Sequence, residues 1–461
     1  MLSLRYSHKA MLCPLGIIGY LAVYFYYFPR RIHLRNLAGK TKRLQQIISA
    51  CPSLWNTYFP TIWAPSTIQQ MALGALRELS IGLGFIRSPY THCETIELHD
   101  GQLLRLDWLI PSHSFQNSPL KQTSPVVVLN HGAFQSSSSV AMFEIARSCA
   151  SKGFPVVVVN RRGYILPLTV PRYDMFGIDE DLDAVLCGPV YKRFPGHPIA
   201  LCGFSCGAII AARYVATRQR KYRESQAPFP DILCGVALDY GFSVSDEGAV
   251  SKMNSPWREI IALLIWVQYY ARQQFSLGTA AIRKEGDDSS FIWTYLSTIF
   301  RNFFLSDPTE PSVAVKATQY IRARSLIRRN NSHFVESVSH EYTRFYHNRD
   351  YNKWLVMAQP KLEDINVPFL LICSHDDPIT RFVNASQFVD EENTASQRGQ
   401  ASPFQNVVLA ELTRGAHGIK SGLLGWPFAR DDMAPRIVAE FIAAVNAALQ
   451  LEKRENPAIL S

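Results

Sequence analysis

Six continuous apolar runs, spaced between residues 125 and 412 of a 461-residue chain, constrain the fold most strongly. They lie at 125–130, 154–160, 198–205, 232–240, 367–377 and 406–412. Such runs are typical of parallel β-strands, because both faces of a parallel sheet are buried. Helical patterns separate the runs, for example at 139–153 and 207–222. The alternation predicts an α/β protein with a mostly parallel central sheet flanked by helices.

Two further regions modify this plan. Residues 95–110 are expected to form two strands around an Asp100-Gly101 turn. Between 240 and 367 the chain has mostly helical composition, including the aromatic-rich stretch 257–275. This interval is far longer than an ordinary connection. We therefore expect an inserted helical cap at about 243–360, lying over the sheet.

The N-terminus carries an uncharged apolar segment at 10–28, followed by arginines. Its 19 residues approach the roughly 20 that a helix needs to cross a bilayer. A cleaved signal peptide is the alternative, but aromatic residues and arginines follow the segment instead of a small-residue cleavage site. We predict a single transmembrane anchor. The excess of Lys and Arg after it favours a cytosolic catalytic domain, whereas the sequons at Asn330 and Asn384 would matter only in the opposite orientation.

Composition limits the partners and the compartment. The net charge is +9, with basic clusters at 30–35 and 322–330, which suit anionic lipid headgroups or solvated helix faces. Nine cysteines without a CxxC pair indicate neither a zinc site nor a disulfide framework. Cys202, Cys234 and Cys373 lie in strand-like runs and are expected to be buried thiols. No phosphate loop or ligand cluster predicts a cofactor, a metal or a nucleic-acid partner.

The stretch "GFSCGA" contains the pattern G-x-S-x-G at Gly203, Ser205 and Gly207. It joins an apolar strand to a helix, the context of a turn that presents a nucleophile. Ser205 holds the middle position, so we predict it to be the nucleophile. The backbone N–H of Cys206 would then donate to an oxyanion, while its thiol packs internally. A catalytic Cys206, or a tight turn with an idle serine, are the alternatives.

The first apolar run ends in a second turn, "NHGAF", which follows the strand directly. The N–H of Ala133 is predicted to be the second oxyanion donor. We expect His131 to brace this turn without proton chemistry.

The remaining members of a catalytic triad are expected after the last two strands, in the order serine, acid, histidine. Asp376 and Asp377 end the run at 367–377, and His417 lies in a glycine-flanked turn after the last run. We predict Asp377 as the acid, with Asp376 left open, and His417 as the base. His375 precedes the acid and is in the wrong order.

Several stretches resemble the membrane-anchored α/β-hydrolase-domain (ABHD) family, which has relatives among yeast acyl-transfer enzymes (medium-chain acyl ester synthase/esterases) and bacterial hydrolases. They are "GFSCGA", "DDP", "GAHG" and the segments 58–70, 100–108 and 160–186. The resemblance implies an α/β-hydrolase fold and a serine hydrolase acting on lipid esters, with its triad at Ser205, Asp377 and His417. The chain has Cys206, Gly207 and Ala208 where the family has Met-Gly-Gly, and a stretched loop at 390–405. These departures affect the expected substrate fit and leave the catalytic groups in place.

The sequence thus predicts a serine esterase or lipase that cleaves phospholipids or acylglycerols. An acyltransferase using an alcohol in place of water is the alternative, and a non-catalytic binding module is a third. The expected organisation is a tail at 1–9, the anchor at 10–28, a helical linker region at 29–94, the hydrolase domain at 95–450 and a tail at 451–461. The expected location is the endoplasmic reticulum or another endomembrane. The oligomeric state is left open.

Overall fold

The computed structural model describes residues 16–35, 41–111, 124–166, 177–225, 231–240, 361–380 and 404–455, together with 394, 397, 398 and 402. The expected cap at about 243–360, the basic cluster 322–330 and both sequons lie outside these residues. The helices and strands are β1 Arg30–Arg31, β2 His33–Arg35, α2 Lys42–Ser49, α3 Pro52–Trp55, β3 Thr57–Tyr58, α4 Thr67–Gly82, β4 His92–Glu97, β5 Leu103–Leu109, β6 Val126–Asn130, α6 Val140–Ser151, β7 Val156–Asn160, α7 Asp179–Val185, the π-helix η2 Leu186–Val190, α8 Tyr191–Arg193, β8 Ile199–Phe204, α9 Cys206–Ser225, β9 Ile232–Leu238, the 3-10 helix η4 Leu362–Asp364, β10 Phe369–Ser374, β11 Val407–Leu412 and α18 Met433–Glu455.

The main sheet has nine strands in the order β2-β11-β10-β9-β8-β6-β7-β5-β4. The six strands from β11 to β7 run parallel to one another. Each of the six apolar runs forms one of them, as predicted. The strand pair around Asp100-Gly101 is also confirmed, because β4 and β5 pair antiparallel and β5 continues the sheet antiparallel to β7.

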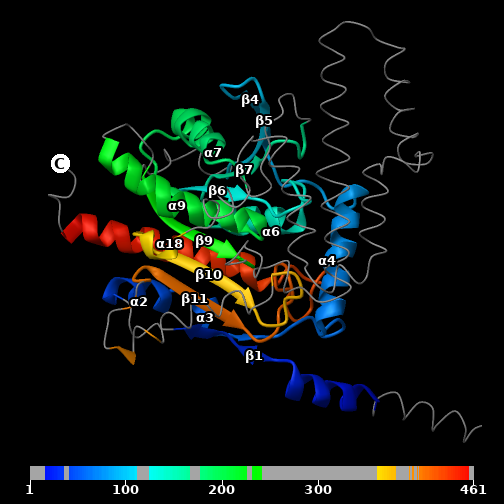
Figure 1. Cartoon of the computed structure of the whole chain (residues 1–461). Helices are drawn as coiled ribbons and strands as arrows, with labels where there is room; N and C mark the ends of the chain where they lie inside the picture. The colour runs from blue at the N-terminus through cyan, green and yellow to red at the C-terminus, as the bar shows by residue number, and fades with distance from the viewer. Residues whose placement is uncertain are drawn as a thin grey trace, which may run out of the picture.

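Helices cover both faces of the sheet (Figure 1). Alternate residues of β8 contact opposite layers: Ile199 and Leu201 join the core that includes α7 and α9, whereas Ala200 and Cys202 join the core that includes α2, α6 and α18. This period of two is the ordinary geometry of a strand. Burial on both faces explains why these strands were continuous apolar runs instead of alternating patterns.

The segment 29–94 contributes more than helices. Besides α2 and α4, it supplies β2, which pairs antiparallel with β11 at the edge of the main sheet. Arg35 in β2 forms an ion pair with Glu411 in β11, with 2.6 Å between Nε and Oε1. Helix α4 begins at a capping box between Ser66 and Gln69. Thr67 is thereby held near the carboxyl ends of the strands, where its hydroxyl reaches the Asp376 carboxylate.

Two described helices bear on the membrane prediction. Residues 16–27 of the predicted anchor are helical and apolar, and the hydroxyls of Tyr20 and Tyr24 donate to the carbonyls of Ile62 and Pro60. Residues 10–15 lie outside the described part. Among the described helices, the stretch Met433–Glu452 of α18 is long and apolar enough to cross a membrane. Half of that stretch is buried within the protein, and Phe441 belongs to the core. A core helix of a folded domain has the same length, composition and burial.

Candidate active site

Ser205 lies in a sharp turn between strand β8 and helix α9. We call this turn the elbow. Its φ is 53°, a left-handed conformation that a non-glycine residue adopts only where the surrounding structure enforces it. The Ser205 N–H donates to the Leu238 carbonyl at 2.9 Å, and the Ala208 N–H donates to the Ser205 carbonyl at 2.9 Å. The turn is therefore fixed from the neighbouring strand β9 and from the first turn of α9. This is the strand-to-helix context that the sequence predicted.

The two glycines flanking Ser205 are required by close backbone packing. A Cβ at Gly203 would lie 2.0 Å from the Gly207 carbonyl oxygen, and one at Gly207 would lie 2.1 Å from the Asn130 carbonyl oxygen. Neither space admits a side chain. The end of β8, the start of α9 and the end of β6 thus meet at backbone contact, which explains the glycines of the G-x-S-x-G pattern.

The turn after β6 faces this elbow. Asn130 is the partner of Gly203 across the β6–β8 pair, so Ala133 follows the strand at the same end of the sheet. His131 is fully buried. Its Nδ1 is 2.8 Å from the Gly132 carbonyl, and its Nε2 accepts a hydrogen bond from the Arg161 N–H at 3.3 Å. Burial, with the Arg161 charge, lowers the pKa of His131 well below its usual value, so the ring is neutral and braces the turn as expected.

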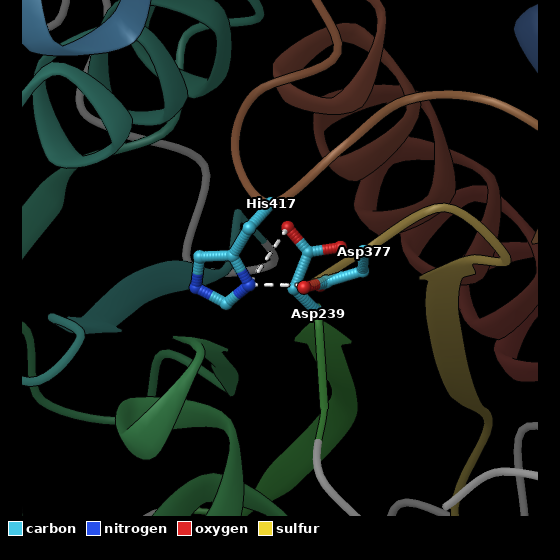
Figure 2. Close-up of side chains that lie close together, drawn as sticks. All are labelled: Asp239, Asp377 and His417. Carbon is cyan, nitrogen blue, oxygen red and sulfur yellow. Dashed lines mark hydrogen bonds and ion pairs between the residues drawn. The ribbon is translucent and has the colours of Figure 1, made fainter. Parts of the chain in front are cut away.

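His417 and Asp377 form the central contact of the site (Figure 2). His417 Nδ1 lies 2.8 Å from Asp377 Oδ2. The imidazole ring is also 5.1 Å, between centroids, from the ring of Phe204, the residue before Ser205. The carboxyl end of β10, the turn after β11 and the elbow after β8 therefore converge. Two residues predicted from their order in the chain and their places after strands are in direct hydrogen-bond contact.

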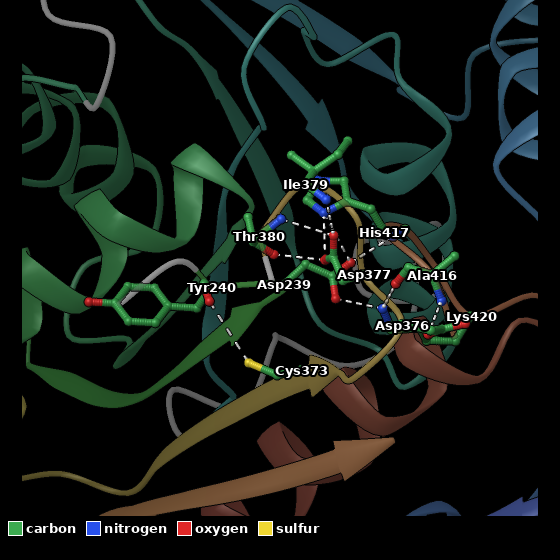
Figure 3. A network of polar contacts seen from close by, with 11 residues as sticks. Asp239, Tyr240, Cys373, Asp376, Asp377, Ile379, Thr380, Ala416, His417 and Lys420 are labelled. Carbon is green, nitrogen blue, oxygen red and sulfur yellow. Dashed lines mark hydrogen bonds and ion pairs between the residues drawn. The ribbon is translucent and has the colours of Figure 1, made fainter. Parts of the chain in front are cut away.

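Asp377 is held by four hydrogen bonds. The backbone N–H groups of Ile379 and Thr380 donate to Oδ1 at 2.7 and 2.9 Å, and the Thr380 hydroxyl donates to Oδ2 at 2.7 Å, beside His417 (Figure 3). Burial alone would raise the pKa of this carboxyl, but the charge and hydrogen bond of His417, with Lys420 and Thr380, lower it to about 2. Asp377 is thus ionised across the physiological range. A fixed carboxylate orients an imidazole and stabilises its protonated form.

The same contacts act on His417. Burial disfavours the charged imidazolium, yet the Asp377 carboxylate, its hydrogen bond and the nearby Asp239 carboxylate raise the pKa of His417 above its usual value. Because Nδ1 bonds Asp377, Nε2 is the ring nitrogen left to exchange a proton with a reactant.

The other residues considered as acid, base or nucleophile contact different parts of the protein. Asp376, left open as the acid, accepts hydrogen bonds from the Thr67 hydroxyl at 2.6 Å and the Ala416 N–H at 2.9 Å. It supports the histidine turn without contacting the ring. His375 lies 3.2 Å from Glu411. Cys206, the first residue of α9, is half-buried and packs against the hydrophobic core that includes α7 and α9. None of the eight described cysteines takes part in a disulfide, and Cys202, Cys234 and Cys373 are buried as predicted.

One acidic residue of the site was missed by the sequence prediction. Asp239 follows β9, is completely buried, and lies 4.0 Å from His417 Nδ1 through its Oδ2 atom. The sequence pattern places Asp239 only at the end of an apolar strand. The available signal was its position, since the carboxyl ends of parallel strands line the ligand site of open α/β sheets.

Asp239, Asp377 and His417 also form a group whose ligand atoms lie within 4.8 Å of one another. That spacing alone would suit a cation. However, the Lys420 ammonium is 2.5 Å from Asp239 Oδ1, and both Asp377 oxygens already accept hydrogen bonds. A metal would have to displace a positive charge and several bonds, so this group fits proton chemistry better than metal binding.

The comparisons with known proteins bear on the fold of the chain. The sequence pattern of the alpha/beta hydrolase fold family matches residues 125–398, more than half of the chain. This protein therefore belongs to the alpha/beta hydrolase fold family.

Individual relatives match this chain at low sequence identity and over only part of its length. The chain is 28% identical over 170 residues to Phospholipase ABHD3 of Mus musculus, covering 36% of this chain and 38% of that protein. It is 28% identical over 178 residues to Protein abhd-3.2 of Caenorhabditis elegans, covering 38% and 44%. The matches thus span less than half the length of these relatives. A solved structure of a fungal esterase from Rhizomucor miehei is 13% identical in sequence, with a TM-score of 0.43. The match covers 84% of this chain and 92% of that chain.

Proposed function

We propose that this protein is a serine hydrolase that cleaves the carboxylic ester bonds of lipids through an acyl-enzyme on Ser205. The observation that carries the proposal is the 2.8 Å contact between His417 and Asp377, next to an elbow that holds Ser205 at a φ of 53°. An enforced backbone conformation at a serine, beside an oriented histidine, is the arrangement of an activated nucleophile.

The reaction follows from these positions. Ser205 Oγ attacks the ester carbonyl carbon and its proton passes to His417 Nε2, while Asp377 stabilises the imidazolium. The backbone N–H groups of Ala133 and Cys206 bind the oxyanion, each contributing about 10²–10³ in rate as in other oxyanion holes. The alcohol leaves with the proton from His417. Water then attacks the acyl-enzyme with His417 as base, releasing the fatty acid and restoring the serine.

Two observations support a lipid substrate. A mouse relative with 28% identity over the matched part is a phospholipase, and the helix at 16–27 exposes apolar side chains such as Ile18, Val23 and Tyr26. A membrane-bound enzyme draws its substrate from the bilayer, which favours phospholipids or acylglycerols over soluble esters.

The same helix supports membrane attachment. With residues 10–15 and Phe28 it makes up the uncharged segment 10–28, which we propose spans an endomembrane, such as that of the endoplasmic reticulum, once. Alkaline carbonate extraction tests this: the full chain should remain with the membrane, and a variant lacking residues 1–28 should be released. Release of the full chain would contradict the anchor.

The catalytic proposal is tested with purified full-length protein in detergent, assayed on phosphatidylcholine and diacylglycerol. We expect fatty acid release that is lost in Ser205→Ala and retained in Cys206→Ala, which keeps the backbone donor. Adding an alcohol separates hydrolysis from acyl transfer, because predominant formation of the new ester would favour an acyltransferase. Folded wild-type protein that turns over no ester would contradict the proposal.

A further inference from the structure

The loop that carries His417 is tied to β9 by one buried carboxylate. Asp239 Oδ2 accepts a hydrogen bond from the Gly418 N–H at 2.6 Å, and Oδ1 pairs with Lys420 Nζ at 2.5 Å. The Lys420 ammonium also donates to the Ala416 carbonyl at 2.7 Å. Figure 3 shows Asp239, Ala416, His417 and Lys420 gathered in this network. The pair thus holds the chain immediately before and immediately after the histidine.

The loop needs such a restraint. Ala416 and Lys420 have φ values of 50° and 57°, and Asp239 itself has a φ of 52°. Left-handed conformations at non-glycine residues are unfavourable and persist only where contacts enforce them. Here the contacts are those of Asp239 and Lys420, and the side chain fixed between the strained residues is His417.

A purely structural role does not explain the pair. Both side chains have no solvent exposure. Removing two charges from water costs so much that apolar residues of similar volume often stabilise a protein equally well or better. A buried ion pair kept beside a histidine is therefore better explained by its effect on that histidine.

We propose that Asp239 and Lys420 are positioning residues for His417. Their ion pair fixes the turn 416–420, and Asp239 places a second carboxylate 4.0 Å from Nδ1, on the side of the ring opposite its reactive nitrogen. The charged groups facing His417 are then Asp377 from the β10 end, Asp239 from the β9 end and Lys420 from its own turn. This inference rests on the proposed role of His417 as the base.

The test compares the wild type with Asp239→Asn/Lys420→Met, in which both charges are removed and the introduced amide can still accept from Gly418. Replacing both partners avoids the unpaired ammonium that could unfold Asp239→Asn. The matched control is Asp179→Asn/Arg213→Met, which removes a partly buried pair with 2.7 Å between Asp179 Oδ1 and Arg213 Nη2. The readouts are the titration of the His417 imidazole by NMR with ¹³C-labelled histidine, assigned with His417→Gln, and the rate of fluorophosphonate labelling.

We expect the double variant to fold, to lower the His417 pKa by about half a unit, and to label about tenfold more slowly where His417 is neutral. The control should change neither readout. An unchanged imidazole pKa and labelling rate in Asp239→Asn/Lys420→Met would overturn the inference and leave the proposed function standing. If wild-type protein is never labelled, the proposed function fails, and the imidazole titration alone decides whether the pair acts on His417.

Discussion

The ends of strands β9 and β10 place a buried aspartate near the same histidine, yet their surroundings differ. Asp377 after β10 accepts four hydrogen bonds, including one from His417. Asp239 after β9 accepts from Gly418 and is neutralised by Lys420. The pKa of Asp377 is lowered to about 2, whereas burial raises the pKa of Asp239 to about 6 despite Lys420. Burial of a carboxylate alone therefore does not define the acid; the bonds that satisfy its charged form do.

The largest expected effect is on catalysis at Asp377. Asp377→Asn keeps the size of the side chain but removes the charge that orients His417 and stabilises its protonated form. We expect ester turnover to fall about 10³–10⁴-fold, as for the acid of other triads. Steady-state kinetics measures the loss, with the melting temperature as a control for folding. A variant within tenfold of wild type would assign the acid role to another residue.

The next effect is on folding at Asp239. Lys420→Met leaves the fully buried Asp239 carboxylate without its counter-ion, which should lower the free energy of unfolding at neutral pH by about 3–5 kcal/mol. Asp239→Asn/Lys420→Met should recover most of this loss. Denaturant unfolding followed by circular dichroism compares the three proteins. Equal stability of Lys420→Met and wild type would show that the pair is not needed to hold the loop.

The two aspartates should give opposite pH dependence. Asp377 has a folded pKa of about 2 against an ordinary 3.8, so its stabilisation, about 2 kcal/mol, is present above pH 3.8 and lost as the pH falls towards 2. Asp239 has a folded pKa of about 6. Its contribution is present below pH 3.8 and lost as the pH rises through 6.

Unfolding measured between pH 2 and 7 resolves these windows. Asp377→Asn should flatten the curve below pH 4, and Asp239→Asn/Lys420→Met should flatten it between pH 4 and 6. Identical curves for both variants would remove the contrast between the two sites.

The smallest effect is expected at Thr380, whose hydroxyl donates to Asp377 Oδ2 at 2.7 Å. Thr380→Val preserves the shape and removes one hydrogen bond to a charged group, costing about 1.5–3 kcal/mol at most. The pKa of Asp377 should rise and turnover should fall by no more than about tenfold. Chemical-shift titration of the Asp377 carboxyl carbon checks the direction. A lowered pKa of Asp377 in Thr380→Val would contradict the role of the Thr380 hydroxyl as its hydrogen-bond donor.

The sequence predicted the sheet well for a physical reason. Strands β6 to β11 are buried on both faces, so each is a continuous apolar run that is recognisable by itself. Strand β2 was not predictable in this way, because it spans three residues, His33–Arg35, two of them polar. Its place depends on pairing with β11 and on the Arg35–Glu411 ion pair, which joins residues 376 positions apart.

The site was predictable to the extent that chain order and strand ends determine it. Asp377 and His417 follow from both, and the structure brings them together. The choice between Asp376 and Asp377 depends on which carboxylate contacts His417 in the folded chain, and no local pattern carries that information. Asp239 and Lys420 are 181 positions apart, so their pairing follows from the tertiary fold. In the sequence, this pair was indicated only by the charged residue Asp239 at the end of an apolar strand.

The measurement that tests the central claim most directly is labelling of the full-length protein with a fluorophosphonate probe, with the modified residue mapped by peptide mass spectrometry. We expect the probe on Ser205 in wild type and in Cys206→Ala, and no labelling in Ser205→Ala. The rate should rise with pH through a midpoint above 6.5, because the pKa of His417 is raised. Labelling on Cys206, or no labelling of folded wild-type protein, would contradict an activated serine at this site.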